Sequence, residues 1–130
     1  MNQNALMHER IEQRIDRINA DLASDLDAYR QAITEEIKGR KGWDCHYDAR
    51  TGLLQGARKL IDSDLEGYWI DINFSRLEMF GEGPVSIFSQ EGTLPWLNYC
   101  DTIDAVYEVM DIVNRAASRR IHTEYSTFKC

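Results

Sequence analysis

Apolar residues recur every three or four positions through the first forty residues, and the chain has no glycine or proline between Met1 and Lys38. The recurring residues are Met7, Ile11, Ile15, Ile18, Leu22, Leu26, Tyr29, Ile33 and Ile37. This spacing repeats over roughly 11 residues, or three helical turns, and it predicts one long amphipathic helix over residues 1–38. A helix of about 35 residues is about 50 Å long, whereas a compact domain made from the whole chain of 130 residues is roughly 36 Å across.

A helix longer than its own domain leaves part of its apolar stripe uncovered. That stripe requires a second surface, so the pattern predicts a homodimer. The predicted dimer interface consists of Ile11, Ile15, Ile18, Leu22 and Leu26. The alternative is a helix that kinks and leaves the chain monomeric.

Residues 42–89 carry the signals of an antiparallel sheet of about four strands. The predicted strands span residues 43–47, 53–61, 68–74 and 85–88. The first two flank Asp48–Gly52, a turn that begins with aspartate and ends with glycine, which favours a hairpin. After the third strand the apolar alternation slips at Ser75 and Arg76, which indicates a bulge or a short turn.

A second amphipathic helix is predicted over residues 101–121. It begins at Asp101, and the acidic residues of its first turn suit the positive end of a helix dipole. Its apolar stripe consists of Ile103, Val106, Tyr107, Met110, Val113, Ala117 and Ile121. The order of helix, meander and helix predicts an α+β fold in a single domain over residues 1–130, with both helices on one face of the sheet.

The composition is that of an ordinary globular protein, with 43% hydrophobic and 28% charged residues. The chain contains no apolar run of the roughly 20 residues that a membrane-spanning helix needs, and no secretion signal is recognised. Cys45, Cys100 and Cys130 are odd in number and widely spaced, which favours free thiols in a reducing compartment. We therefore expect a cytoplasmic protein with no membrane partner.

The net charge of −7 is concentrated in the middle of the chain. Residues 61–112 contain one basic residue, Arg76, and the acids Asp62, Asp64, Glu66, Asp71, Glu78, Glu82, Glu91, Asp101, Asp104, Glu108 and Asp111. Such a field repels nucleic acid and attracts basic protein surfaces. A basic patch formed by Lys38, Arg40, Lys41, Arg115, Arg119 and Arg120 is the alternative that would allow direct nucleic-acid binding, and we expect no such binding.

No motif specifies catalysis, a cofactor or a metal. Asp62, Asp64 and Glu66 begin like a calcium loop, but the twelfth position, which needs a bidentate carboxylate, is Asn73 inside a predicted strand. Cys45 and His46 are neighbours on a strand, so they face opposite sides of the sheet and cannot act as nucleophile and base. We expect no catalytic residues, no metal and no cofactor.

An aromatic residue beside carboxylates is the strongest indication of a binding surface. Trp69, Asp71 and Asn73 alternate with the apolar residues of their strand and are predicted to face outward. A rigid aromatic anchor among acids is typical of a surface that selects a basic partner. The predicted partner-binding residues are Trp69, Asp71, Asp62, Asp64, Glu66, Glu78 and Glu82. The alternative is that a loop or the second helix covers Trp69.

These features predict a non-catalytic inhibitor or antidote that masks a basic surface of a nuclease or of a nucleic-acid-binding complex. Bacterial immunity proteins and phage anti-defence proteins are often of this size and charge, but that is a likeness of type, and no residue motif identifies a family. The alternatives are a dimeric secretion-type chaperone and a small-molecule binder with a pocket at a dimer seam. The residues considered for that pocket are Trp43, Tyr47, Arg50, Trp96 and His122.

Overall fold

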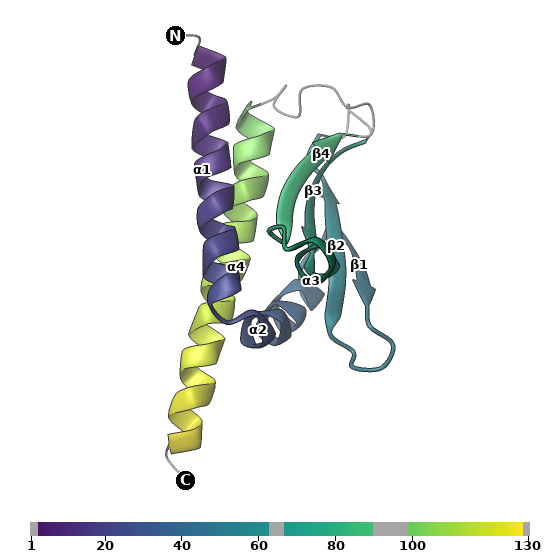
Figure 1. Cartoon of the computed structure of the whole chain (residues 1–130), viewed down its shortest axis with the longest axis vertical. Coiled ribbons are helices and arrows are strands. Elements are labelled where there is room, and N and C mark those ends of the chain that lie inside the picture. The colour runs from purple at the N-terminus through teal and green to yellow at the C-terminus, as the bar shows by residue number, and fades with distance from the viewer. Residues whose placement is uncertain (1–2, 63–66, 90–98, 129–130) are drawn as a thin grey trace.

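A computed structural model of the chain describes residues 3–62, 67–89 and 99–128 (Figure 1). Its elements are α1 (Gln3–Ser24), α2 (Leu26–Lys38), β1 (Trp43–Tyr47), β2 (Leu54–Leu60), β3 (Tyr68–Asn73), α3 (Phe74–Phe80), β4 (Val85–Ser89) and α4 (Tyr99–Phe128). The strands form one antiparallel meander in the order β1-β2-β3-β4. The predicted α+β class, with N-terminal helices, a four-stranded sheet and a C-terminal helix, is confirmed.

The three long helices lie together on one face of the sheet (Figure 1). Figure 1 shows α1 and α4 side by side, while α2 turns away from α1 toward the sheet. Helix α4 contacts both α1 and α2, and α1 contacts the edge strand β4. No helix among the described residues is long and apolar enough to cross a membrane.

The prediction of one continuous helix over residues 1–38 is wrong, because the chain bends at Asp25. Asp25 is the N-cap of α2, with φ −157° and ψ 75°, and its carboxylate accepts a hydrogen bond from the Ala28 N–H. A capping aspartate with non-helical dihedral angles starts a new helix. The apolar stripe nevertheless continues in phase through the bend, so α1 and α2 both direct it toward the same core.

Two other boundaries differ from the predictions. The expected bulge or turn at Ser75 and Arg76 is a short helix, α3, because the Asn73 side chain caps it by accepting a hydrogen bond from the Arg76 N–H. Helix α4 begins at Tyr99 and continues to Phe128, beyond the predicted range 101–121. The C-terminal end of α4 projects beyond the rest of the fold, and so does the N-terminal end of α1 (Figure 1).

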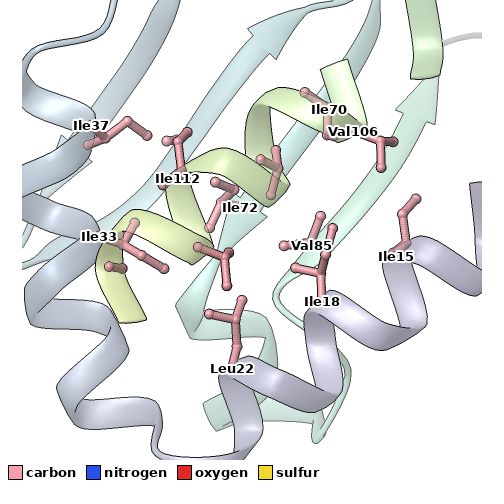
Figure 2. Close-up of a cluster of buried hydrophobic side chains, with 14 of the residues drawn as sticks. Ile15, Ile18, Leu22, Ile33, Ile37, Ile70, Ile72, Val85, Val106 and Ile112 are labelled. Carbon is pink, nitrogen blue, oxygen red and sulfur yellow. The ribbon is translucent and has the colours of Figure 1, made fainter. Parts of the chain in front are cut away.

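The core lies between the three long helices and the sheet (Figure 2). Figure 2 shows aliphatic side chains meeting there from α1, α2, α4 and the two strands β3 and β4. The labelled residues are Ile15, Ile18, Leu22, Ile33, Ile37, Ile70, Ile72, Val85, Val106 and Ile112, and all of them are buried.

The predicted dimer interface is covered by the chain itself. Ile11, Ile15, Ile18 and Leu22 are at most 9% exposed, and Leu26 is partly buried against the same core. Burial of these side chains against α4 and β4 removes the apolar surface from which a homodimer was predicted. The stripe of α1 is therefore a core-packing face of this chain, and the expectation that it is left uncovered was wrong.

Candidate functional site

A groove with a volume of about 480 Å³ separates part of α1 from the edge strand β4. The residues that line this α1–β4 groove are Glu12, Ile15, Asp16, Asn19, Arg76, Glu82, Gly83, Val85, Ser86 and Ile87. The wall on α1 is set by helical spacing, because Glu12, Asp16 and Asn19 follow one another at intervals of four and three residues. The opposite wall is the backbone and the side chains of β4.

The two walls are joined at one end by Asn19. Its Nδ2 donates a hydrogen bond to the Val85 carbonyl oxygen at 3.0 Å, and its Oδ1 accepts one from the Val85 N–H at 2.8 Å. A carboxamide thus gives Val85 the same pair of bonds that a neighbouring strand would give. Gly83 allows this close approach, since a Cβ there would lie 2.3 Å from Asn19 Nδ2.

The pairing of β3 with β4 determines which backbone groups face the groove. The Asn73 N–H donates to the Pro84 carbonyl at 2.7 Å, and Val85 and Ile87 stand opposite Ile72 and Ile70. In an antiparallel ladder, alternate residues direct their N–H and C=O toward the partner strand and away from it. Val85 and Ile87 are both in the outward-directed set.

Ile87 therefore presents an N–H and a C=O at the open edge of the sheet. Asn19 occupies the corresponding groups of Val85, but among the described residues no side chain or backbone group bonds to those of Ile87 on this side. Such an unpaired edge is a template for another strand. The Ile87 side chain itself packs against the core, partly buried.

Three carboxylates border the groove. Glu12 and Asp16 on α1 and Glu82 before β4 are all exposed, and none forms an ion pair with a described residue. The basic residues of α1 lie on the other side of the helix from Glu12 and Asp16. Arg14, for example, stacks over the Tyr107 ring of α4 at 5.1 Å. The helix therefore presents mainly negative charge to the groove.

The one cation that lines the groove, Arg76, is already paired. It donates a hydrogen bond from Nη2 to Asp71 Oδ2 at 2.9 Å and another from Nη1 to the Ser86 hydroxyl. Asp71 is only 4% exposed, and Arg58 lies on its other oxygen at 3.8 Å. Burial raises the pKa of Asp71, while the two guanidinium groups act in the opposite direction.

Asp71 was predicted as an exposed acid of the partner-binding surface, and its burial contradicts that prediction. The residue does share the outer face of β3 with Trp69, as the alternation indicated. Helix α3 accounts for the difference, because it places Arg76 over Asp71. The carboxylate is thereby committed to an internal ion pair and is not available to a partner.

Trp69 is only partly exposed. Its ring lies 5.9 Å from the Arg58 guanidinium, and its indole Nε1 is buried with no hydrogen-bond partner among the described residues. A cation stacked on the ring and a covered N–H make Trp69 a poorer anchor for a basic partner than a free tryptophan. This arrangement favours the alternative in which other parts of the chain cover Trp69.

The other predicted partner-binding acids do not form one surface. Glu78 is exposed but is paired with Arg30 at 3.2 Å, and Asp62 is partly buried and makes further interactions. Glu82 lines the α1–β4 groove. Asp64 and Glu66, two of the acids of the calcium-like loop, lie outside the described residues.

Sequence reasoning missed the two α1 acids that face the groove, Glu12 and Asp16. Their spacing from Asn19 was a usable signal, because it placed three polar residues on one helical face. The sequence carried no sign that β4 would lie beside this face.

The residues of the possible basic patch are largely neutralised. Arg40 and Arg115 both bond to Asp111, at 2.5 and 3.1 Å, and Arg119 bonds to Glu36 at 2.6 Å. Lys38 pairs with Glu35 at 3.3 Å. The C-terminal end of α2 does come close to these bases, but it meets the middle of α4, and the contact brings the acids Glu36 and Asp111 along with the bases.

The residues considered for chemistry are separated. Cys45 is half-buried on the helix-facing side of β1, where burial raises the pKa of its thiol, and the neighbouring His46 is exposed. Within the described part of the chain, no group of three His, Cys, Asp or Glu side chains is arranged to hold a metal ion.

The residues considered for a small-molecule pocket are not assembled by the described structure. Trp43 donates its indole N–H to Glu108 at 2.8 Å. Tyr47 is exposed at the other end of the same strand, about 13 Å away at the usual rise per residue. Arg50 is exposed in the turn that follows, and the side chains of Trp96 and His122 lie outside the described set.

Comparison of the chain with protein-family models, with curated proteins and with solved structures found no match. The candidate site therefore depends on the geometry of the α1–β4 groove alone.

Proposed function

We propose that this chain is a non-catalytic protein-binding protein that recognises a basic segment of its partner in the α1–β4 groove. The observation that carries the proposal is the set of three exposed carboxylates, Glu12, Asp16 and Glu82, beside an unpaired strand edge. Carboxylates without internal cations are free to pair with lysine or arginine from another molecule. Such pairs select a partner and accelerate association more than they add affinity.

The charge balance favours a protein partner over nucleic acid. The chain carries a net charge of −7, and four of its described cations, Arg40, Arg76, Arg115 and Arg119, are bound to its own acids. Neutralising a phosphate backbone requires free lysine and arginine side chains. A basic protein surface needs the opposite charge, which is what the groove offers.

The biological consequence that we propose is masking. A small acidic protein bound to the basic surface of a nuclease, or of another nucleic-acid-binding complex, competes directly with the phosphates that the surface binds. Inhibition then requires occupancy of that surface and no chemistry from the inhibitor. This is the inhibitor or antidote role predicted from the charge distribution, now assigned to Glu82 from the predicted set together with Glu12 and Asp16.

The test is a pull-down from host-cell extract with a matched control. The groove variant is Glu12→Lys/Asp16→Lys, and the control is Asp21→Lys/Asp104→Lys, which makes the same change in net charge at exposed acids outside the groove. We expect the wild type and the control to retain equal amounts of the same basic protein. The groove variant should retain at least ten-fold less of it. Equal recovery by the groove variant would overturn the proposed site.

The purified partner then tests the masking role. Its nucleic-acid binding or cleavage is measured with increasing amounts of the wild-type chain. We expect inhibition that is complete near one equivalent and absent with the groove variant. Full partner activity in the presence of a saturated complex would contradict inhibition while leaving binding intact.

A further inference from the structure

We infer that the partner binds as an extended strand that adds to β4 and forms backbone hydrogen bonds with Ile87. This inference rests on the proposed function, because it takes the basic partner for granted and specifies how that partner is held. Strand addition is a common mode of peptide recognition, in which the backbone supplies affinity and alternate side chains supply specificity.

The first support is the direction of the Ile87 backbone. Ile87 stands opposite Ile70 in the same ladder that turns Val85 outward, so its N–H and C=O point away from β3. In an antiparallel ladder, one residue of a neighbouring strand forms both backbone hydrogen bonds with a single outward-directed residue such as Ile87. One residue of an added strand can therefore pair with Ile87 without displacing any bond of the sheet.

The second support is Asn19, which shows that this edge accepts a strand-like partner. Its carboxamide forms the two bonds with Val85 that a fifth strand would form there. Asn19 therefore also sets a limit, because an added strand must stop before Val85 or displace the side chain. Toward the N-terminal end of α1, helix and strand diverge (Figure 1), and Ile87 lines the groove between them.

The third support is the charge around the two free edges of the sheet. The β4 edge faces Glu12 and Asp16. Near the β1 edge, the Lys38 ammonium is paired with Glu35 and the Lys59 ammonium is paired with Glu108. The carboxylates at the β4 edge have no ion-pair partner among the described residues, so a basic segment is attracted to that edge.

The alternation of a strand predicts the pattern of the bound segment. Side chains on one face of the added strand lie toward α1 and meet Glu12 and Asp16, while those on the other face lie toward Arg76. The favoured segment therefore has lysine or arginine at alternate positions and uncharged residues between them. A segment that is basic at every position would place cations beside Arg76.

The test uses a seven-residue peptide that alternates valine and lysine, and a matched peptide that alternates valine and glutamate. Binding to the full chain is measured by fluorescence anisotropy, and exchange of the Ile87 amide proton is followed by NMR. We expect the lysine peptide alone to bind and to slow Ile87 amide exchange at least ten-fold. No binding of the lysine peptide at millimolar concentration, or unchanged Ile87 exchange on binding, would overturn strand addition.

A pair of variants separates the backbone from the side chain. Ile87→Pro removes the outward N–H without removing a bond to β3, and Ile87→Ala removes the same side chain but keeps the N–H. We expect Ile87→Pro to bind the lysine peptide at least ten-fold more weakly than Ile87→Ala. A near-ultraviolet circular dichroism spectrum like that of Ile87→Ala verifies that the proline variant is folded. If the proline variant does not fold, Asp16→Lys, which leaves β4 intact, still tests whether binding of the lysine peptide is lost.

The two proposals fail in different ways. Equal binding by folded Ile87→Pro and Ile87→Ala would reject strand addition, and a loss of binding in the Glu12→Lys/Asp16→Lys variant would still support the acidic groove. Unchanged binding in that charge variant, together with a loss in Ile87→Pro, would reject the proposed preference for a basic partner.

Discussion

Asn19 and Val85 exchange two hydrogen bonds between a helix side chain and the backbone of an edge strand. The two residues are 66 positions apart in the chain, and their contact fixes α1 against β4 at the end of the groove. Because the bonds use both outward-facing groups of Val85, the contact also protects part of a strand edge that is open further along.

Replacing Asn19 with leucine should destabilise the fold. Leucine fills a similar volume but leaves the N–H and C=O of the buried Val85 without their partner, which typically costs about 1–3 kcal/mol. Urea denaturation measures the loss. Asn114→Leu, at an exposed position on α4, is the control and should change the free energy of unfolding by about 0.5 kcal/mol or less. Equal effects of the two substitutions would show that the Asn19 bonds add little.

Gly83→Ala should weaken the same contact from the other side. The new Cβ would lie 2.3 Å from Asn19 Nδ2 and 2.5 Å from its Cγ, so the side chain or the strand must shift, at a cost of about 1–3 kcal/mol. Gly39→Ala is the matched control, because a Cβ at Gly39 meets nothing within 4 Å. Thermal unfolding of both variants, and of Gly83→Ala combined with Asn19→Ala, is the measurement.

The combined variant makes that prediction specific. If the clash with Asn19 causes the loss, shortening Asn19 to alanine removes it, and the two substitutions cost less together than the sum of their separate effects. Simple additivity would mean that Gly83 matters for another reason.

The period of the apolar residues predicted much of this fold. It identified the buried face of both N-terminal helices, since Ile11, Ile18, Leu22 and Ile33 are all in the core. It missed the bend at Asp25 because α2 continues in phase with α1. A capping aspartate followed by Asp27 in the first turn was the available signal. Periodicity shows which side chains are buried, but it does not show what covers them.

The candidate site was less accessible to sequence reasoning. Alternation correctly placed Trp69 and Asp71 on one face of β3, but it could not show that Arg76 would fold back over Asp71 from a helix. The approach of α1 to β4 depends on long-range packing, and only that packing turns Glu12 and Asp16 into the wall of a groove. Local patterns therefore predicted the elements better than the surfaces between them.

Asp71 should give the chain a specific dependence of stability on pH. Burial raises the pKa of Asp71 in the folded protein, so the folded state holds its proton more tightly than the unfolded state. The contribution of Asp71 to the free energy of unfolding is therefore fully present below its unfolded-state pKa of about 3.9. It is lost as the pH rises through the raised pKa of Asp71 in the folded protein.

Comparison with Asp71→Asn isolates that contribution, because the other carboxylates are common to both proteins. Urea denaturation at increasing pH from about 3.5 should show the wild type losing stability relative to Asp71→Asn as the pH rises through the raised folded pKa of Asp71. A wild type that instead gains stability relative to the variant would mean that Arg76 and Arg58 outweigh burial and lower the Asp71 pKa.

Thr34 holds the start of β2 against α2 in the way that Asn19 holds β4 against α1. Its hydroxyl donates to the Arg30 carbonyl at 2.7 Å and accepts a hydrogen bond from the Leu54 N–H at 2.8 Å. Thr34 and Leu54 are both buried, at 2% and 0% exposure, so water cannot replace this acceptor. Thr34→Val keeps the shape but leaves the Leu54 N–H unsatisfied, and we expect a loss of about 1–3 kcal/mol.

Thr34→Ser separates the hydroxyl from the methyl group. Serine keeps the acceptor for Leu54 and loses one buried methyl, which is worth about 0.8 kcal/mol. If the hydrogen bond is what matters, urea denaturation should therefore rank the valine variant as less stable than the serine variant, even though valine is the closer match in shape and the more apolar residue. The reverse order would mean that packing of the methyl group, and not the bond to Leu54, attaches α2 to the sheet.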